Sequence, residues 1–415
     1  MLIQAIGSAA TLGAAAFVAW RFGLAAQGEF GLLRSWSDAL VALAALGLPQ
    51  GLLHLQYHEG ATARSLRPFI RGHLALLAVL AVPALLAIAF AHLSDAAAAH
   101  RVQVGIVVAA VPFGVGHLLW RALVLKAQGV VRYSVVTGLP SVLVFAGVLA
   151  LAALDTPKGF AVVIFIAAAV ACVVSAIWST PQGAADAPAS PAPSTSSATP
   201  AWPRRVLWSV SLQTWVQGAL AALLVALLLS LARAFGAPLS EVGVVSLGLY
   251  VYQLFGVLAT YAAPVVYDRV AGAPAGAARF ATLGRWRARA VAVAFVAFVA
   301  ALVGPRAVAL AWPTSAVHAD SVTLFAVAGL SALGTRLGAT LLQALGRLRE
   351  LSMQAAWRLV AALAITTAAM QAMPASYAVP LALLAIEVAT VVRLVALLRR
   401  DGVPPAPVAT EEGAA

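Results

Sequence analysis

Cysteine and charged residues are both scarce in this sequence. Its 415 residues include one cysteine, Cys172, which lies within an apolar run. A single cysteine excludes a framework of internal disulfides, and its apolar surroundings argue against a metal site. Only 10% of the residues are charged, with 26 Lys and Arg against 14 Asp and Glu. Because the positive charges are spread over short loops between apolar runs, we expect no nucleic-acid partner.

The sequence motifs of common enzymes are also absent. There is no nucleophile elbow, no phosphate-binding loop and no regular metal-ligand spacing. His54 and His58 with Glu59 come nearest to a metal site, but they lie in a basic loop and we interpret them as an interfacial surface. We therefore expect no enzyme, no metal and no cofactor.

Apolar runs dominate what remains. Hydrophobic residues make up 63% of the chain, and its mean hydropathy is +0.97. The runs do not alternate apolar with polar residues as barrel strands do, and a helix of about 20 apolar residues crosses a membrane. We therefore predict an all-α, polytopic membrane protein with about 12 transmembrane helices. The expected spans are residues 2–20, 35–54, 70–91, 102–125, 133–154, 159–178, 206–231, 242–266, 289–311, 320–345, 353–373 and 376–398.

One long polar segment divides the chain. It contains the string ADAPASPAPSTSSATPAWP, whose Pro, Ala and Ser content is typical of a flexible linker. We therefore predict an N-terminal six-helix lobe at 1–178, a cytoplasmic linker at 179–205, a C-terminal six-helix lobe at 206–398 and a cytoplasmic tail at 399–415.

Basic residues gather on one side of the predicted membrane. Most Lys and Arg residues lie in the loops that share a side with the N-terminus, and Arg21 and Arg34 are local exceptions. Positive charge is typical of cytoplasmic loops. We therefore predict a multi-pass protein of the bacterial inner membrane with both termini in the cytoplasm.

A short motif recurs in the two halves of the chain. RFGLAAQGEFG (Arg21–Gly31) follows the first span, and RAFGAPLSEVG (Arg233–Gly243) follows the seventh. Each copy has Phe-Gly at the end of one span and Glu-x-Gly at the start of the next. A proline then interrupts the following helix, at Pro49 and at Pro264. Six spans separate the copies, so the motif predicts two pseudo-symmetric lobes related by a parallel repeat, as in some transporters.

The stretch RFGLAAQGEFG, followed by a helix that ends in LGLPQGLL (Leu46–Leu53), resembles the polysaccharide flippases of the multidrug/oligosaccharidyl-lipid/polysaccharide exporter superfamily. The stretch from Leu231 to Tyr267 resembles the seventh and eighth helices of that family. The resemblance implies a two-lobed carrier that moves a polyprenyl-pyrophosphate-linked oligosaccharide, an O-antigen, capsule or exopolysaccharide unit, across the inner membrane. Its partners would be this lipid-linked substrate, membrane lipid and other glycan-assembly membrane proteins.

Three arginines are candidates for binding the pyrophosphate, because a guanidinium can hold phosphate oxygens with two hydrogen bonds. Arg336 lies in GTRLG (Gly334–Gly338), whose two glycines allow another helix to approach closely. It could face a cavity, pair with Glu387 inside the bundle, or extend to the interface. For Arg358 we favour the interpretation that its side chain extends to the cytoplasmic interface. For Arg121 the sequence leaves open whether the side chain faces a cavity or extends to the interface.

Polar residues of spans seven and eight are candidates for binding sugar. Tyr250 and Gln253 share one helical face with residues 257 and 261, and Gln217 lies in the preceding span. Aromatic and amide groups suit a hydroxyl-rich sugar. Hydrogen bonding between helices is an equally good interpretation.

Two acidic residues within spans are candidates for ion coupling. Asp38 follows Arg34 by four residues, so a structural ion pair is the favoured interpretation there. Glu387 lies deeper in its span and is the better candidate for proton coupling. If these acids contribute more to transport than the arginines do, the protein is a drug/cation antiporter of the same superfamily, which is the alternative hypothesis. A third, weaker hypothesis is a membrane enzyme of glycan assembly.

Overall fold

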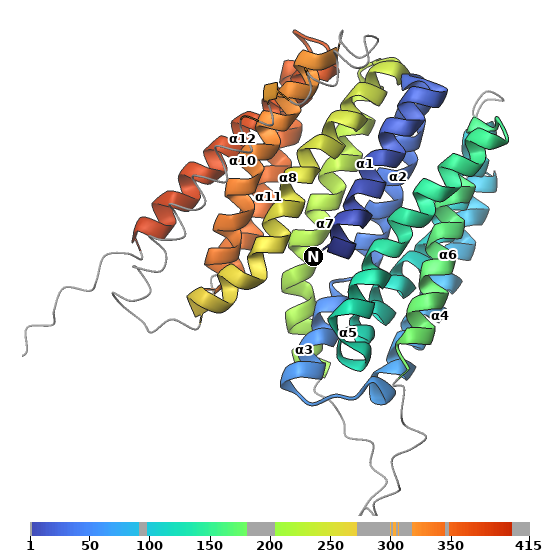
Figure 1. Ribbon diagram of the computed structural model, residues 1–415, viewed down its shortest axis with the longest axis vertical. Helices are drawn as coiled ribbons and strands as arrows, with labels where there is room; N and C mark the ends of the chain where they lie inside the picture. Colours follow the sequence, from blue (N-terminus) through green and yellow to red (C-terminus); the bar gives the residue numbers. More distant parts are fainter. Residues whose placement is uncertain are drawn as a thin grey trace, which may run out of the picture. The chain divides into compact units, whose positions relative to one another are not determined.

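The fold is all-helical throughout the part of the chain that the computed structural model describes. That part comprises residues 2–90, 98–180, 204–271, 318–344 and 348–400, with a few single positions near residue 300. The helices are α1 (Leu2–Phe22), α2 (Leu24–Ala44), α3 (Leu48–His58), α4 (Ala63–Phe90), α5 (Ala98–Ala153), η2 (Pro157–Gly159), α6 (Phe160–Trp178), α7 (Arg204–Ala234), α8 (Leu239–Ala271), α10 (Ala319–Ala344), α11 (Leu348–Ala369) and α12 (Ala375–Arg400) (Figure 1).

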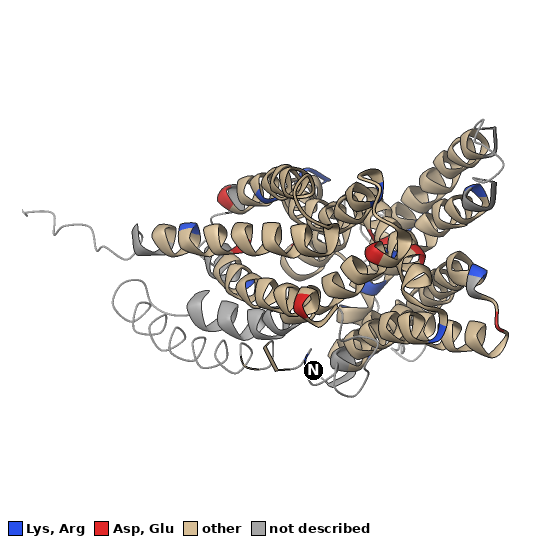
Figure 2. Cartoon of the chain, turned by 90° about the horizontal axis from the view of Figure 1, so that it is seen from above, with Lys and Arg blue, Asp and Glu red and all other residues tan. Residues whose placement is uncertain are grey.

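These helices confirm the predicted fold class. Each expected span other than 289–311 falls on described helices, although 35–54 runs across α2 and α3 and α5 contains two spans; residues 289–311 lie almost wholly outside the described part. Within that part, eight helices are long and apolar enough to cross a membrane, or nine if the bent pair α2 and α3 forms one span. Along them charged residues are few (Figure 2). The boundary that differs most is the start of α2, which begins at Leu24, whereas the sequence predicts a loop up to residue 34.

The chain divides into two compact units. The first comprises Met1–Tyr250 and Thr366–Ser376, and the second comprises Val251–Ile365 and Tyr377–Ala415. In the first unit α5 packs on α1, α4 and α6, and α7 packs on α2 and α3. The second unit contains most of α11 and α12, together with α10 and the second half of α8. The lobe boundaries predicted from the linker stay a prediction.

The long helix α5 contains two of the expected spans. Its 56 residues are far more than one crossing of a membrane needs. At Gly129 the backbone leaves the helical region, with φ 78° and ψ 179°. Because glycine tolerates positive φ without steric cost, the break falls there, between the spans expected at 102–125 and 133–154.

Pro49 marks a second break, between α2 and α3, which are bent by 46°. Gly47 adopts a left-handed conformation with φ 67°, and a Cβ there would lie 2.0 Å from the Ser211 carbonyl oxygen of α7. The break frees carbonyl groups at the end of α2. The Trp215 indole donates to the Leu43 carbonyl at 3.0 Å, and the His73 ring donates to the Ala44 carbonyl at 3.1 Å. Side chains of α7 and α4 thus replace the lost backbone hydrogen bonds.

The two copies of the repeated motif lie against each other in the first unit, where α2 meets α8. A Cβ at Gly28 would be 2.2 Å from the Leu239 carbonyl oxygen, and one at Gly243 would be 1.9 Å from the Leu24 carbonyl oxygen. The two backbones are therefore in direct contact, which only glycine allows. Beside this contact the buried Gln27 amide donates to the Ser246 hydroxyl at 3.1 Å. The partner helix thus supplies an acceptor for the amide nitrogen of this buried polar residue.

The α2–α8 contact predicts that Gly243→Ala destabilises the protein. The new methyl group would meet a backbone carbonyl that cannot move aside, and overpacking of this kind costs about 1–3 kcal/mol. We expect a lower melting temperature and less monodisperse protein in detergent. Gly218→Ala is the matched control, because a Cβ at this α7 position meets nothing within 4 Å. Equal melting temperatures for the two variants would contradict the close packing described for α2 and α8.

Candidate functional site

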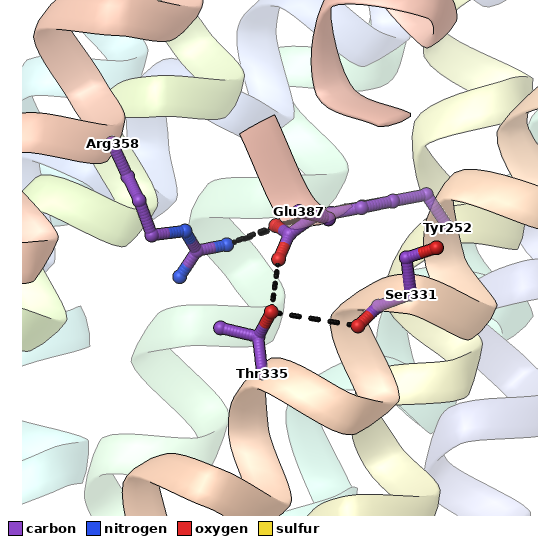
Figure 3. A network of polar contacts seen from close by, with 5 residues as sticks. All are labelled: Tyr252, Ser331, Thr335, Arg358 and Glu387. Atoms are coloured by element: carbon purple, nitrogen blue, oxygen red, sulfur yellow. Dashed lines mark hydrogen bonds and ion pairs between the residues drawn. The ribbon is translucent and has the colours of Figure 1, made fainter. Parts of the chain in front are cut away.

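Glu387 is the centre of a buried polar cluster in the second unit. It lies within α12 and is 1% exposed. Its carboxylate accepts three hydrogen bonds, and Figure 3 shows the side chains that surround it. Oε1 accepts from the Tyr252 hydroxyl at 2.5 Å and from the Arg358 guanidinium, which also forms an ion pair with it, and Oε2 accepts from the Thr335 hydroxyl at 2.6 Å. A buried carboxylate is costly unless it is paired and hydrogen-bonded, and here it is both.

Each participant comes from a different helix. Tyr252 lies on α8, Thr335 on α10, Arg358 on α11 and Glu387 on α12. Tyr252 and Thr335 are buried, and Arg358 retains 23% exposure of its side chain. The cluster therefore ties four helices together around one negative charge.

The Thr335 hydroxyl has a choice of acceptors. Besides the Glu387 carboxylate, it lies 3.4 Å from the Ser331 carbonyl oxygen one turn earlier in α10. A hydroxyl carries one proton but can also accept a hydrogen bond. When Glu387 is protonated it can donate to the Thr335 oxygen, whose own proton then turns to Ser331. The cluster can thus satisfy Glu387 in either protonation state.

Arg358 differs from its expected placement. The sequence favours extension of its side chain to the membrane interface, but the guanidinium instead pairs with Glu387 and lies 3.4 Å from the Tyr252 hydroxyl. The predicted buried arginine–glutamate pair exists with Arg358, rather than with Arg336, as its cation. Arg393, near the end of α12, is exposed.

Arg336 lies on α10 with its guanidinium against Gly256 of α8. A Cβ at Gly256 would be 2.0 Å from its Nη1 atom. The Arg336 charge is also close enough to Tyr252 to interact with it. The glycines on either side pack on α12, because a Cβ at Gly338 would be 2.9 Å from Leu394. The prediction that the GTRLG segment admits a neighbouring helix is confirmed.

The acidic candidate of the first unit, Asp38, forms the expected local ion pair. The Arg34 Nε atom lies 3.1 Å from its carboxylate, one helical turn away. Tyr250 on α8 lies close enough to interact with both charges. This placement agrees with the structural interpretation of Asp38.

The remaining candidates are placed separately. Arg121 lies in the first unit, with its guanidinium 5.6 Å from the centre of the Tyr133 ring. Gln217 on α7 and Gln253 on α8 are half-buried. Of the predicted polar face of span eight, the side chains at 257 and 261 lie outside the described residues. The roles of these residues in binding stay predictions.

Thr335 is difficult to predict from the sequence, because it is a small hydroxyl residue in an apolar span. The one feature of the sequence that could have drawn attention to Thr335 is its position directly before Arg336.

The histidine cluster forms a ring contact. The centres of the His54 and His58 rings are 4.6 Å apart. In the described part of the chain, no group of three or more His, Cys, Asp or Glu residues is arranged to hold a metal ion.

Comparison with known proteins identifies the fold. No protein-family model and no curated protein sequence matches the chain.

Solved structures with a similar fold do match the chain. The inward-facing conformation of a multidrug resistance MATE family transporter of the MOP superfamily gives a TM-score of 0.69 at 14% identity, covering 95% of this chain and 96% of that one. The outward-facing conformation of such a transporter gives 0.60 at 14% identity, covering 97% and 96%. The MATE multidrug transporter DinF-BH, in complex with a ligand, gives 0.60 at 15% identity, covering 97% and 92%. The chain therefore has the fold of these MATE transporters.

The Arg358–Glu387 pair predicts a characteristic pattern of stabilities. Arg358→Met leaves a buried carboxylate without its cation, which costs about 3–5 kcal/mol. Replacing both partners, as Arg358→Met with Glu387→Leu, removes the uncompensated charge and should recover part of the loss. Melting temperatures in detergent test this, with the exposed Arg393→Met of α12 as the control. An Arg358→Met variant as stable as Arg393→Met would contradict the pair's structural role.

Proposed function

We propose that the chain is a secondary membrane transporter that works by alternating access and is coupled to a cation through Glu387. The observation that carries the proposal is the buried Glu387 carboxylate with its three donors, in a chain with the fold of MATE transporters. The fold occurs in inward-facing and outward-facing conformations, which are the two states that alternating access needs. We further propose that the protein lies in a bacterial inner membrane with both termini in the cytoplasm.

A change in the charge of Glu387 would alter the contacts between helices. Ionised Glu387 holds the Arg358 guanidinium of α11 and the Tyr252 hydroxyl of α8. Protonation would weaken both contacts, because a neutral carboxyl attracts a guanidinium far less strongly. A ligand or proton shifts a conformational equilibrium only by interacting differently with the two states. The Glu387 cluster supplies such a difference.

For the substrate we favour drug/cation antiport, the alternative that the sequence left open. The solved structures with this fold named above are multidrug transporters. An antiporter also gives a role to a carboxylate that can be protonated from one side of the membrane and deprotonated toward the other.

A lipid-linked oligosaccharide is the second candidate substrate. It is supported by the guanidinium groups of Arg336 and Arg358, both within spans and both close to Tyr252. Two arginines suit a pyrophosphate, which they can bind through several charge-assisted hydrogen bonds. In this case the partners would be the lipid-linked unit, membrane lipid and glycan-assembly membrane proteins.

The proposal predicts that a proton gradient drives transport of a cationic dye, for which ethidium is a suitable fluorescent probe. Purified protein in liposomes should accumulate ethidium when a pH gradient is imposed in one direction and not in the other. Glu387→Gln should reduce accumulation to that of empty liposomes, because the amide cannot exchange a proton. Dye fluorescence and an internal pH indicator, recorded together, measure both fluxes.

Asp320→Asn is the control for that experiment. Asp320 is an exposed carboxylate in the first turn of α10 in the same unit, so its loss should leave transport unchanged. Glu387→Gln transporting as well as the wild type would refute the coupling role of Glu387. A wild-type protein that moves no ethidium under either gradient would count against drug/cation antiport.

Deletion of the gene in its host distinguishes the two substrate classes. Antiport predicts unchanged surface glycan and greater sensitivity to cationic drugs. Finished lipid-linked units accumulating on the cytoplasmic leaflet, with loss of surface glycan, would establish the second candidate in its place. Truncated glycan chains would point to an enzyme.

A further inference from the structure

Three buried polar atoms near Glu387 have no hydrogen-bond partner among the described residues. They are the Nε atom of Arg358, the amide nitrogen of Gln354 and the hydroxyl oxygen of Thr390. Gln354 is 5% exposed and Thr390 is fully buried. All three belong to α11 and α12 within the second unit. Since a buried polar atom left unsatisfied costs about 1–3 kcal/mol, three together call for an explanation.

The register of the two helices brings these atoms to one line. α11 and α12 run antiparallel, with Arg358 opposite Glu387 and, further along, Leu351 packed with Leu394. Gln354 precedes Arg358 by one helical turn, and Thr390 follows Glu387 by nearly one turn. The two residues therefore lie level with each other, between those two contacts.

A water molecule fits the chemistry of this position. Buried water typically makes about three hydrogen bonds to polar groups that lack protein partners. The Gln354 amide and the Arg358 Nε–H can donate to such a water, and the Thr390 hydroxyl can donate or accept. Water there would remove the desolvation cost and would connect to the Glu387 carboxylate through Arg358.

The line of polar residues formed by Arg358, Gln354 and Thr390 continues toward one end of the second unit and stops toward the other end. One turn before Gln354, Glu350 lies partly exposed in the first turn of α11. In the opposite direction the next residues on the same faces are Ala362 on α11 and Leu383 on α12, both buried and apolar. Along these two helix faces the polar residues therefore extend from Glu387 toward the start of α11. That end is the one that the distribution of basic residues predicts to be cytoplasmic.

We propose that Arg358, Gln354, Thr390 and Glu350 line a hydrated proton path between Glu387 and the end of the second unit at which α11 begins. This inference rests on the proposed role of Glu387 as the coupling carboxylate. A proton leaves the Glu387 carboxyl for a water molecule in direct contact with it, passes through the water held by Gln354 and Thr390 to the Glu350 carboxylate and is released to solvent. The Arg358 guanidinium stays protonated throughout and only orients the water. Glu387 is left ionised, and no other bond changes.

The charges around the path favour this direction of release. Glu387 is faced by Arg358 of α11 and by the Tyr252 hydroxyl of α8, while the Arg336 guanidinium of α10 lies close to Tyr252. The Arg358 guanidinium stabilises the ionised carboxylate. The Glu350 carboxylate, about 12 Å along α11 from Arg358, can attract the released proton toward solvent.

The test measures how fast Glu387 exchanges its proton after a jump in pH, in purified protein without substrate. Infrared spectroscopy follows the carbonyl band of the protonated carboxyl, assigned to Glu387 by its loss in Glu387→Gln. Gln354→Leu and Thr390→Val should each slow the exchange by about ten-fold or more while leaving the titration midpoint unchanged. Gln354→Asn and Thr390→Ser retain the polar group and should restore much of the rate.

Matched controls are Thr323→Val and Gln371→Leu. The Thr323 hydroxyl donates to the Ala319 carbonyl of its own helix, and Gln371 is exposed beyond the end of α11. Exchange as fast in Gln354→Leu and Thr390→Val as in these controls would overturn the path while leaving the role of Glu387 intact. Absence of a Glu387 band at any pH in the wild type would instead overturn the coupling role, and the path with it.

Discussion

Nothing in the hydrocarbon core of a membrane can hydrogen-bond to a polar group, so the protein or water trapped within it must satisfy every such group. The break between α2 and α3 obeys this constraint through Trp215 and His73, which cap the freed carbonyls of Leu43 and Ala44. The Glu387 cluster obeys it through donors from three other helices. Where the described side chains leave polar atoms unsatisfied, as beside Gln354, the same constraint points to water and hence to a route for protons.

The sequence predicts the helices well because the membrane imposes one dominant pattern. Runs of about 20 apolar residues mark the spans directly, and glycine and proline mark the breaks at Gly129 and Pro49. The motif shared by the two halves was also informative, since its glycines form the contact between α2 and α8. The start of α2 was missed because its polar residues resemble a loop. Only the opposite helix, with Ser246 accepting from Gln27, explains why they lie in a helix.

The partners within the site could not be predicted in the same way. Helical spacing gives the face on which a residue lies, but it does not say which helix is opposite that face. The sequence therefore suggested Arg336 as a partner for Glu387 and extension to the interface for Arg358, whereas the packing of α11 against α12 brings Arg358 to Glu387. Hydroxyl groups such as those of Tyr252 and Thr335 are inconspicuous in apolar spans, and their importance appears only once they surround a charge.

The central claim is that substrate and proton compete through Glu387. The most direct test adds ethidium to weakly buffered, detergent-solubilised protein and measures the pH of the solution as the dye binds. The account predicts that binding releases protons from the wild-type protein and that Glu387→Gln binds the dye without releasing them. Equal proton release from both proteins, or dye binding by the wild type with no release at any pH, would contradict it.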